Sequence, residues 1–377
     1  MNQKEISELR RRFQPGKSAI SHIYGCYVND SREIIARIDK SLGLMPEEEA
    51  TKYLTLLKRA ISGRLGKNLI DVVFSTQQVK DSQEHSFLMN LRHSELKDYN
   101  LRETLYQRII NNLDAEGSYL ILLGYEAYDV PTKKSDDEDT NKAADQTSDQ
   151  IFRYFVCAVC PINSGKPELE YNTSSNEFEL CPPGQTVANP DIGFMFPAFD
   201  NRSTNIYSAL YYSRKADEPH QEFYKSFFHV EPPMTATEQK ETFQAALESA
   251  NICSMAAFQG IHEQIKMRID DHKEAKETEP LVLTSEDICE ILTDCDVKED
   301  HVKAFQSCYN DYFGKDTALF PENIIDSGKY EIKMGDTVLN IPPDRSHLIE
   351  TRIIDGVKYL LIPVDSNAEV NGFPVIV

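Results

Sequence analysis

The sequence predicts an α+β protein with two regions, and three observations lead to this fold class. Long β-type runs, "SYLILLGYEAYDVP" and "IFRYFVCAVCPI", occupy the middle of the chain. Stretches with apolar residues at helical spacing lie on both sides of these runs. Two further helical stretches and several short β-type runs then follow a polar segment near the C-terminal quarter. We therefore expect a mixed, mainly antiparallel sheet covered by helices, with a smaller C-terminal helix pair and β-meander.

The N-terminal part alternates helices and strands. Ile6, Leu9 and Phe13 recur at helical spacing, which predicts a short amphipathic helix. Residues 18–39 contain two β-type runs around "VNDSR" and predict a hairpin. The stretch "PEEEATKYLTLLKRAIS" predicts a helix, because glutamates follow Pro46 and basic residues end it, as the helix dipole favours. "NLIDVVFS" predicts a strand, and helices are expected to follow it.

Residues 131–150 contain the acidic separator "TKKSDDEDTNKAADQTSDQ", which has almost no apolar residues. We expect this segment to be disordered. The β-type runs on its two sides match in length and character, and antiparallel neighbours can be joined by any loop. Lengthening a loop costs only about 0.6 kcal/mol per doubling. We therefore interpret the segment as a loop insertion within one main domain, residues 1–275.

Residues 280–377 are expected to form a smaller α+β domain. The polar stretch "KEAKETEP" ends in proline and marks the boundary. Beyond it, "SEDICEILTDCD" and "KEDHVKAFQSCYNDYF" predict two helices, and four short β-type runs follow. In "IIDGVKYLL", Asp-Gly between apolar runs is typical of a hairpin with a type I′ turn.

The charge of the chain is large and uneven. The formal net charge is -21, yet residues 1–67 carry 13 Lys/Arg against 8 Asp/Glu and are therefore +5, which leaves -26 for the remainder. Binding to nucleic acid or to an anionic membrane is not expected, since long-range repulsion opposes the encounter. An anionic ligand would dock more readily on the N-terminal segment.

Composition indicates a cytoplasmic protein. No apolar run approaches the roughly eighteen residues of a membrane helix, and "MNQKEISELRRRF" has neither the apolar core nor the cleavage site of a secretory signal. The eight cysteines are spread along the chain, too sparsely for a disulfide scaffold. We expect them to be reduced and mostly buried.

The segment "SGRLGKN" contains two candidates for anion binding. It does not match the phosphate-loop motif, because Gly63 and Gly66 enclose too few residues and Asn68 follows Lys67. Arg64 and Lys67 nevertheless place two cations beside flexible backbone in the positive part of the chain. The alternatives are an anion site and a glycine helix stop followed by a solvated loop.

No metal site and no complete catalytic motif is predicted, and the cofactor is unknown. "HEQIK" lacks the second histidine of a zinc-protease helix, since Lys266 stands in its place, so His262 is interpreted as an ordinary helix residue. Cys157 and Cys160 of "CAVC" lie in a β-type run and should point to opposite faces, which favours core packing over a metal site. "TDCDVKED" lacks the glycine and terminal glutamate of a calcium loop.

The most concentrated mixed-polarity set is Asp200, Asn201, Arg202, Ser203 and Thr204, here called the pentad. Asp200 has the chemistry of a base or a metal ligand, Arg202 that of an anion clamp, and Ser203 or Thr204 that of a hydroxyl donor or nucleophile. No nucleophile-elbow or "SxxK" pattern accompanies them. The same residue types also suit turns and helix caps. Three interpretations stay open, namely a turn and cap, a binding site, and a catalytic site.

Nine segments spread over the chain carry a resemblance to a known family: "MNQKEISELRRRF", "GCYV", "SGRLGKNL", "YDVP", "CPIN", "FPAFDNRSTNIYSALYYS", "EQKETF", "ETRIIDG" and "EVNGF". Together they resemble the bacterial domain-of-unknown-function family 4317 over essentially the whole chain, with "FPAFDNRST" and "SGRLGKN" the most specific parts. The resemblance implies a cytosolic protein of Gram-positive anaerobes. It implies no activity, cofactor or catalytic residue.

These observations favour a non-enzymatic binding or regulatory protein that recognises a protein partner or an anionic small molecule. Whether the chain is an enzyme stays open. The alternative is a phosphoester or nucleotide hydrolase of unfamiliar type, in which Asp200 and Arg202 face the anion and "GRLGK" adds cations from across a cleft.

Overall fold

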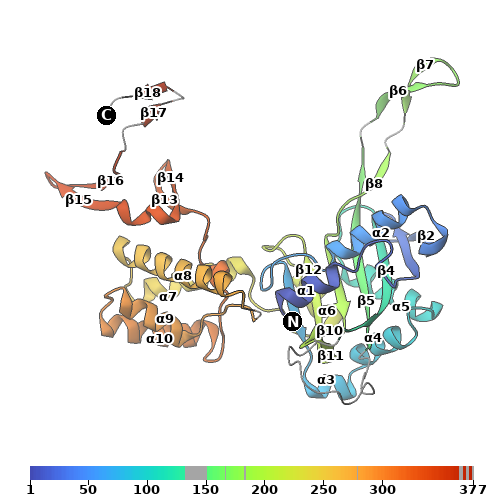
Figure 1. The fold of residues 1–377 in the computed structure, drawn as a ribbon, viewed down its shortest axis with the longest axis horizontal. Coiled ribbons are helices and arrows are strands. Elements are labelled where there is room, and N and C mark those ends of the chain that lie inside the picture. The colour runs from blue at the N-terminus through green and yellow to red at the C-terminus, as the bar shows by residue number, and fades with distance from the viewer. Residues whose placement is uncertain are drawn as a thin grey trace, which may run out of the picture. The chain divides into compact units, whose positions relative to one another are not determined.

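The computed structural model describes residues 1–131, 151–165, 167–181, 184–277, 279–364, 368–370 and 373–375 (Figure 1). The disorder predicted for the acidic segment falls on residues that lie outside this range. The chain forms two compact units, Met1–Thr235 (unit 1) and Ala236–Val377 (unit 2). The predicted α+β class, with a mainly antiparallel sheet, covering helices and C-terminal strand pairs, is confirmed.

Unit 1 is built on an eight-stranded sheet with the order β2-β1-β4-β5-β9-β12-β3, and β8 pairs with the end of β5. All these pairs are antiparallel. Strands β4 and β5 flank the acidic segment and pair from Tyr119↔Pro161 to Asp129↔Ile151, so the predicted antiparallel pairing of the two long runs is confirmed. The strands are β1 (His22–Val28), β2 (Ile34–Ser41), β3 (Leu69–Val73), β4 (Tyr119–Asp129), β5 (Ile151–Ser164), β8 (Gln185–Val187), β9 (Ile192–Phe196) and β12 (Ser208–Ser213).

Both faces of the central strands of this sheet are buried, because these strands are apolar at successive positions. Alternation along a strand sends neighbouring side chains to opposite faces. In β5, Cys157 therefore packs in one core and Cys160 in the other, as predicted from the sequence. Burial raises the pKa of the Cys160 thiol to about 12, which agrees with a packing role rather than a reactive one.

Helices cover the two faces separately. The helices α1 (Gln3–Arg10) and α2 (Glu47–Arg59) pack on the face that contains Cys160, and α4 (Gln83–His93), α5 (Tyr99–Asn112) and α6 (Gln221–Phe228) pack on the face that contains Cys157. The close approach of α2 depends on Gly193 in β9, where an added Cβ would lie 2.6 Å from the Cβ of Ala60. Two short helices complete the unit, η1 (Leu42–Leu44) and α3 (Thr76–Asp81).

Two hairpins of unit 1 stand outside the main sheet. The hairpin of β6 (Glu168–Asn172) and β7 (Glu177–Cys181) extends away from the sheet beyond β8 (Figure 1). The second hairpin, β10 (Ala198–Asp200) with β11 (Ser203–Asn205), contains the pentad and contacts helix α1.

Unit 2 combines a helical core with separate two-stranded hairpins (Figure 1). Its elements are α7 (Ala236–Ser249), α8 (Met255–Ala275), α9 (Ser285–Asp294), α10 (Glu299–Phe313), α11 (Pro321–Ile324), β13 (Tyr330–Met334), β14 (Thr337–Ile341), η2 (Pro343–Leu348), β15 (Glu350–Ile354), β16 (Val357–Leu361), β17 (Ala368–Val370) and β18 (Phe373–Val375). The core joins Phe243 of α7 and Ile265 of α8 to Ile291 of α9 and Phe305 of α10. The predicted Asp-Gly hairpin is present, since Asp355 and Gly356 link β15 to β16 with φ values of 50° and 81°.

Helices α7 and α8 belong to unit 2, whereas the sequence predicts them within the main domain, residues 1–275. Their apolar faces share one core with α9 and α10. The domain boundary at residues 275–280 stays a prediction, and the core of unit 2 provides a test for it.

Candidate functional site

The pentad forms a tight hairpin turn. Asn201 and Arg202 have φ values of 48° and 57°, and positive φ at both central residues is the requirement of a type I′ turn. Ser203 and Thr204 pair with Asp200 and Phe199 across the hairpin. The residues that follow form β11 and β12, so they do not begin the helix that Ser203 or Thr204 would cap.

The charged groups of the pentad contact the N-terminal helix. Arg202 donates from Nη1 to Glu8 Oε2 at 2.5 Å and from Nη2 to the carbonyl oxygen of Pro131 at 2.9 Å. Its backbone N–H donates to Glu5 Oε1 at 3.1 Å. Asp200 accepts from Asn205 Nδ2 at 3.3 Å. These contacts make the hairpin a clamp for α1.

A buried carboxylate strengthens the same attachment. Glu126 of β4 is 1% exposed, and its Oε1 accepts from Arg12 Nε at 2.8 Å and from the backbone N–H of Ala19 at 3.0 Å. Its Oε2 accepts from the hydroxyl of Tyr154 at 2.5 Å. Burial, followed by the charge of Glu126, raises the pKa of Tyr154 well above its ordinary value. Buried charges of this kind need complete pairing, and Glu126 obtains it from Arg12.

The "SGRLGKN" segment closes on itself. Gly66 has a φ of 71°, and its N–H donates to the carbonyl oxygen of Leu69, while the N–H groups of Lys67 and Asn68 donate to that of Arg64. Those backbone donors, which an anion would need, are therefore used within the turn. The Asn68 side chain donates to the carbonyl oxygen of Ser213 at 3.0 Å. Lys67, next to Asn68, therefore lies near the C-terminal end of β12, whereas the pentad lies before the N-terminal end of that strand.

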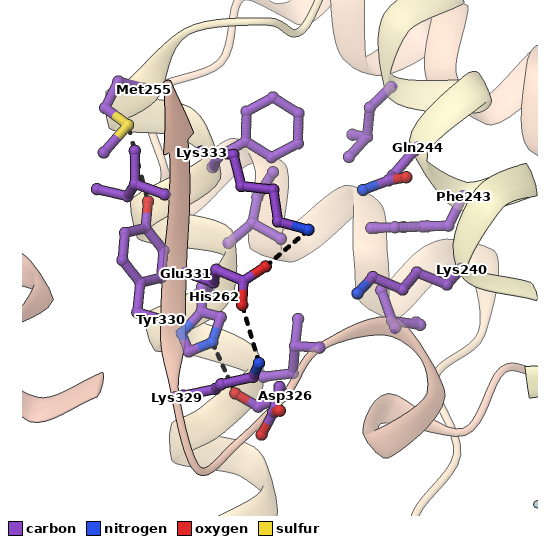
Figure 2. A pocket seen from close by; sticks show the side chains of 16 residues that line it. Lys240, Phe243, Gln244, Met255, His262, Asp326, Lys329, Tyr330, Glu331 and Lys333 are labelled. Atoms are coloured by element: carbon purple, nitrogen blue, oxygen red, sulfur yellow. Dashed lines mark hydrogen bonds and ion pairs between the residues drawn. The ribbon is translucent and has the colours of Figure 1, made fainter. Parts of the chain in front are cut away.

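A pocket of about 660 Å³ lies in unit 2 between α7, α8, α11 and β13 (Figure 2). Aromatic and aliphatic side chains make up much of its wall, among them Phe243, Leu247, Phe258, Ile261, Ile324 and Ile332. Five charged side chains also line it, and cations exceed anions by three to two: Lys240, Lys329, Lys333, Asp326 and Glu331. This arrangement is a mixed apolar and cationic cavity in a chain whose net charge is -21.

The cations of the pocket differ in their partners. Glu331 accepts from Lys329 Nζ at 2.9 Å and forms an ion pair with Lys333 Nζ at 3.1 Å. The hydrogen bond from Lys329, followed by the one from Lys333, lowers the pKa of Glu331. Lys240 extends from α7 across the pocket and forms no ion pair with any residue that the structure describes (Figure 2). One ammonium is therefore available to an anionic ligand.

His262 connects the helical wall to the strand wall. Its side chain is buried, its Nε2 lies 3.0 Å from the carbonyl oxygen of Asp326, and its ring packs edge-on against Tyr330 at 5.1 Å. Its neighbour Glu263 accepts from the hydroxyl of Ser346 at 2.8 Å. The interpretation of "HEQIK" as ordinary helix is consistent with these contacts. Within the described parts of the chain, no three His, Cys, Asp or Glu side chains are grouped to hold a metal ion.

This pocket is not predicted from the sequence, although the sequence contains two signals for it. "KYEIK" alternates Lys329, Glu331 and Lys333, and the period of a strand places all three on one face. "EQKETF" contains Lys240 and Phe243 three residues apart, which is one helical turn. Neither pattern says that the two segments face each other, because they are about ninety residues apart and meet only through the packing of α7, α8 and β13.

Fold and pocket together define a two-unit α+β protein with a cationic, partly apolar cavity in its second unit. The chain belongs to the family described as domain of unknown function (DUF4317), whose model matches residues 1–373. This confirms the resemblance that the sequence segments indicate. A comparison with curated proteins finds no match. Among the helices that the structure describes, none has the length and apolar character to cross a membrane.

Proposed function

We propose that this protein is a non-enzymatic binding protein whose second unit takes a small amphipathic anion. The observation that carries the proposal is the ammonium of Lys240, which has no ion-pair partner among the described residues and lies at the wall of the unit 2 pocket opposite the Lys329–Glu331–Lys333 cluster (Figure 2). Of the two partner classes that the sequence favours, the pocket supports the anionic small molecule. The "SGRLGKN" segment supports an anion site less well, because the backbone N–H groups of Gly66, Lys67 and Asn68 are bonded within the turn.

The size and lining of the pocket support a ligand with an apolar body. A volume of about 660 Å³ lies within the range of roughly 300–1,000 Å³ that is usual for small-molecule sites. Phe243 and Phe258 would contact that body, and burying it would provide most of the binding free energy. The polar groups would then set orientation and specificity.

The charge of the pocket supports an anionic headgroup. A ligand carboxylate or phosphate within reach of Lys240 would form a charge-assisted hydrogen bond, which is stronger than a neutral one. Attraction at the pocket has to act against the negative field of the whole chain. Affinity should therefore depend on Lys240 directly and should fall as salt concentration rises.

A cytoplasmic, bacterial setting is part of the same proposal. The seven cysteines whose side chains are described are all free thiols, as is usual in a reducing compartment. Three of them, Cys26, Cys157 and Cys160, are fully buried. The cofactor stays unknown, and the proposal needs none.

The proposal is tested by calorimetric titration of the full chain with octanoate and with octyl phosphate, using octyl glucoside as a neutral ligand with the same tail. We expect both anions to bind and the glucoside to bind more weakly. Lys240→Gln should weaken the binding of both anions about fivefold or more, which corresponds to the loss of one charge-assisted bond.

The matched control is Lys315→Gln, because Lys315 is an exposed lysine of unit 2 outside the pocket. It removes the same charge and should leave both affinities unchanged. The proposal is wrong if neither anion binds, or if the two lysine variants weaken binding equally, since the second result would mean that only the net charge of the chain matters.

A further inference from the structure

We propose that Glu331 acts as an internal competitor in the unit 2 pocket, and that a ligand headgroup with two negative charges displaces it from Lys333. The ligand class that follows is a phosphate monoester attached to an apolar body. This inference rests on the proposed function and names the headgroup that the same site prefers.

The first step is the geometry of β13. Lys329 immediately precedes the strand, and Glu331 and Lys333 follow at intervals of two, so all three side chains lie on one face. A single carboxylate thereby contacts both ammonium groups, at 2.9 Å from Lys329 and 3.1 Å from Lys333. The carboxylate of Glu331 thus occupies the position at which a ligand anion would meet these lysines (Figure 2).

The second step is the weakness of these ion pairs. The side chain of Glu331 is 29% exposed, and those of Lys329 and Lys333 are 50% and 70% exposed. Ion pairs as exposed as these contribute little to stability, because water competes for both partners. Breaking the Lys333 pair therefore costs little, and a stronger acceptor can replace Glu331 without disturbing the fold.

The third step separates two classes of headgroup. A carboxylate carries one charge, which Lys240 alone can neutralise. The ion pairs of Glu331 with Lys329 and Lys333 can therefore stay intact. A phosphate monoester carries nearly two charges above its second pKa of about 6 and has three acceptor oxygens. We expect such a group to accept from Lys240 on α7 and from Lys333 on β13 at once, because both side chains extend into the same pocket from opposite sides (Figure 2). Only the second class competes with Glu331.

The experiment compares Glu331→Gln with the wild-type full chain at about pH 8, where the phosphate monoester is a dianion. We expect the Kd of octyl phosphate to fall about fivefold or more in the variant, because the competing charge is gone. The Kd of octanoate should change by less than about twofold, since that headgroup does not need Lys333.

Glu299→Gln is the matched control. It removes the same charge from an exposed ion pair of the same unit, with Lys303 at 2.6 Å, outside the pocket. It should change neither affinity. Inorganic phosphate, titrated alone, tests whether the headgroup suffices, and we expect binding too weak to measure. Vesicles containing phosphatidate test a lipid source, and we expect no retention, because the chain carries -21.

The outcomes separate the two proposals. If neither anion binds the wild type or Glu331→Gln, the proposed function fails. If both bind and depend on Lys240, but Glu331→Gln leaves octyl phosphate binding unchanged or weaker, the competitor role of Glu331 fails alone. An equal gain for both anions would refute the preference for a dianion. Retention on phosphatidate vesicles would contradict a soluble phosphate monoester and would indicate a membrane lipid as the ligand.

Discussion

Arg202 donates to Glu8 at 2.5 Å across 194 residues of sequence, and this bond fixes the first helix of the chain to the β10–β11 hairpin. Arg202, which the sequence suggests as an anion clamp, therefore binds the carboxylate of Glu8 in its own chain. Its second guanidinium nitrogen is engaged by the carbonyl oxygen of Pro131. The charged side chain of the pentad that contacts α1, Arg202, thus attaches this helix to the hairpin.

The first prediction concerns this attachment. Arg202→Ala should lower the free energy of unfolding by about 1–2 kcal/mol, since a charge-assisted bond and a packed stem are lost. The side chains of Arg202 and Glu8 are 30% and 25% exposed, so solvent screening keeps the loss below that of a fully buried pair. Urea denaturation followed by circular dichroism measures it.

A double-mutant cycle with Glu8→Gln isolates the pair. We expect a coupling energy of about 1 kcal/mol between the two positions. Additive losses, with no coupling, would contradict the role of the bond as a clamp for α1.

The second prediction concerns hydrolysis. We expect the wild-type chain to release no phosphate from nucleotides with Mg²⁺ above the buffer background. The guanidinium of Arg202 is engaged by Glu8 and by the carbonyl oxygen of Pro131, so the cation that the hydrolase hypothesis needs for the substrate phosphate is already used within the chain. A phosphate-release assay at a temperature where both proteins stay folded compares the wild type with Arg202→Ala. Turnover that the variant loses would restore the hydrolase hypothesis.

The third prediction is a dependence of stability on pH through Tyr128. Its hydroxyl donates to Glu8 Oε1 at 2.5 Å, and burial, followed by this bond, raises the pKa of Tyr128 from 10.0 to about 12. Because the folded value is the higher one, the neutral phenol stabilises the folded state. That contribution is complete below about pH 10 and is lost as pH rises towards about 12.

Tyr128→Phe removes this contribution. The stability advantage of the wild type over the variant should therefore be constant up to about pH 10 and shrink above it, as urea titrations at a series of pH values would show. Tyr359→Phe, at an exposed position of unit 2, should show no such change. An advantage that stays constant from about pH 8 to pH 11 would exclude a linked role for Tyr128.

The fourth prediction decides between two domain boundaries. A fragment of residues 236–377 should unfold cooperatively, because Phe243 and Ile265 remain with their partners Ile291 and Phe305. A fragment of residues 280–377 lacks α7 and α8 and exposes the remaining half of that core, so we expect no cooperative transition. Thermal and urea unfolding of both fragments provides the measurement. A cooperative transition in the shorter fragment would establish the boundary at 275–280 instead.

The sheet and its helices could be read from local patterns. The long runs of β4 and β5 are apolar at successive positions over most of their length, which is typical of strands buried on both faces. Glutamates at the start of α2 and basic residues at its end predict this helix. The pentad is recognisable as a turn because Asp, Asn and Ser tolerate or stabilise turn backbones.

The partners of charged side chains could not be read in this way. Nothing in the neighbourhood of Arg202 indicates Glu8, and nothing near Glu126 indicates Arg12. The cationic wall of the unit 2 pocket likewise needs Lys240 from one helix and Lys333 from a strand about ninety residues later.

By itself the sequence determined the α+β class, the antiparallel character of the long strands, the opposite orientation of Cys157 and Cys160, and the family. Each of these follows from periodicity, composition or motif, which are properties of neighbouring residues. Only the tertiary structure decided that the pentad holds the first helix and that a cationic pocket forms in unit 2. Those features depend on which distant side chains meet, and side-chain pairing across the fold is set by the packing of whole elements rather than by local spacing.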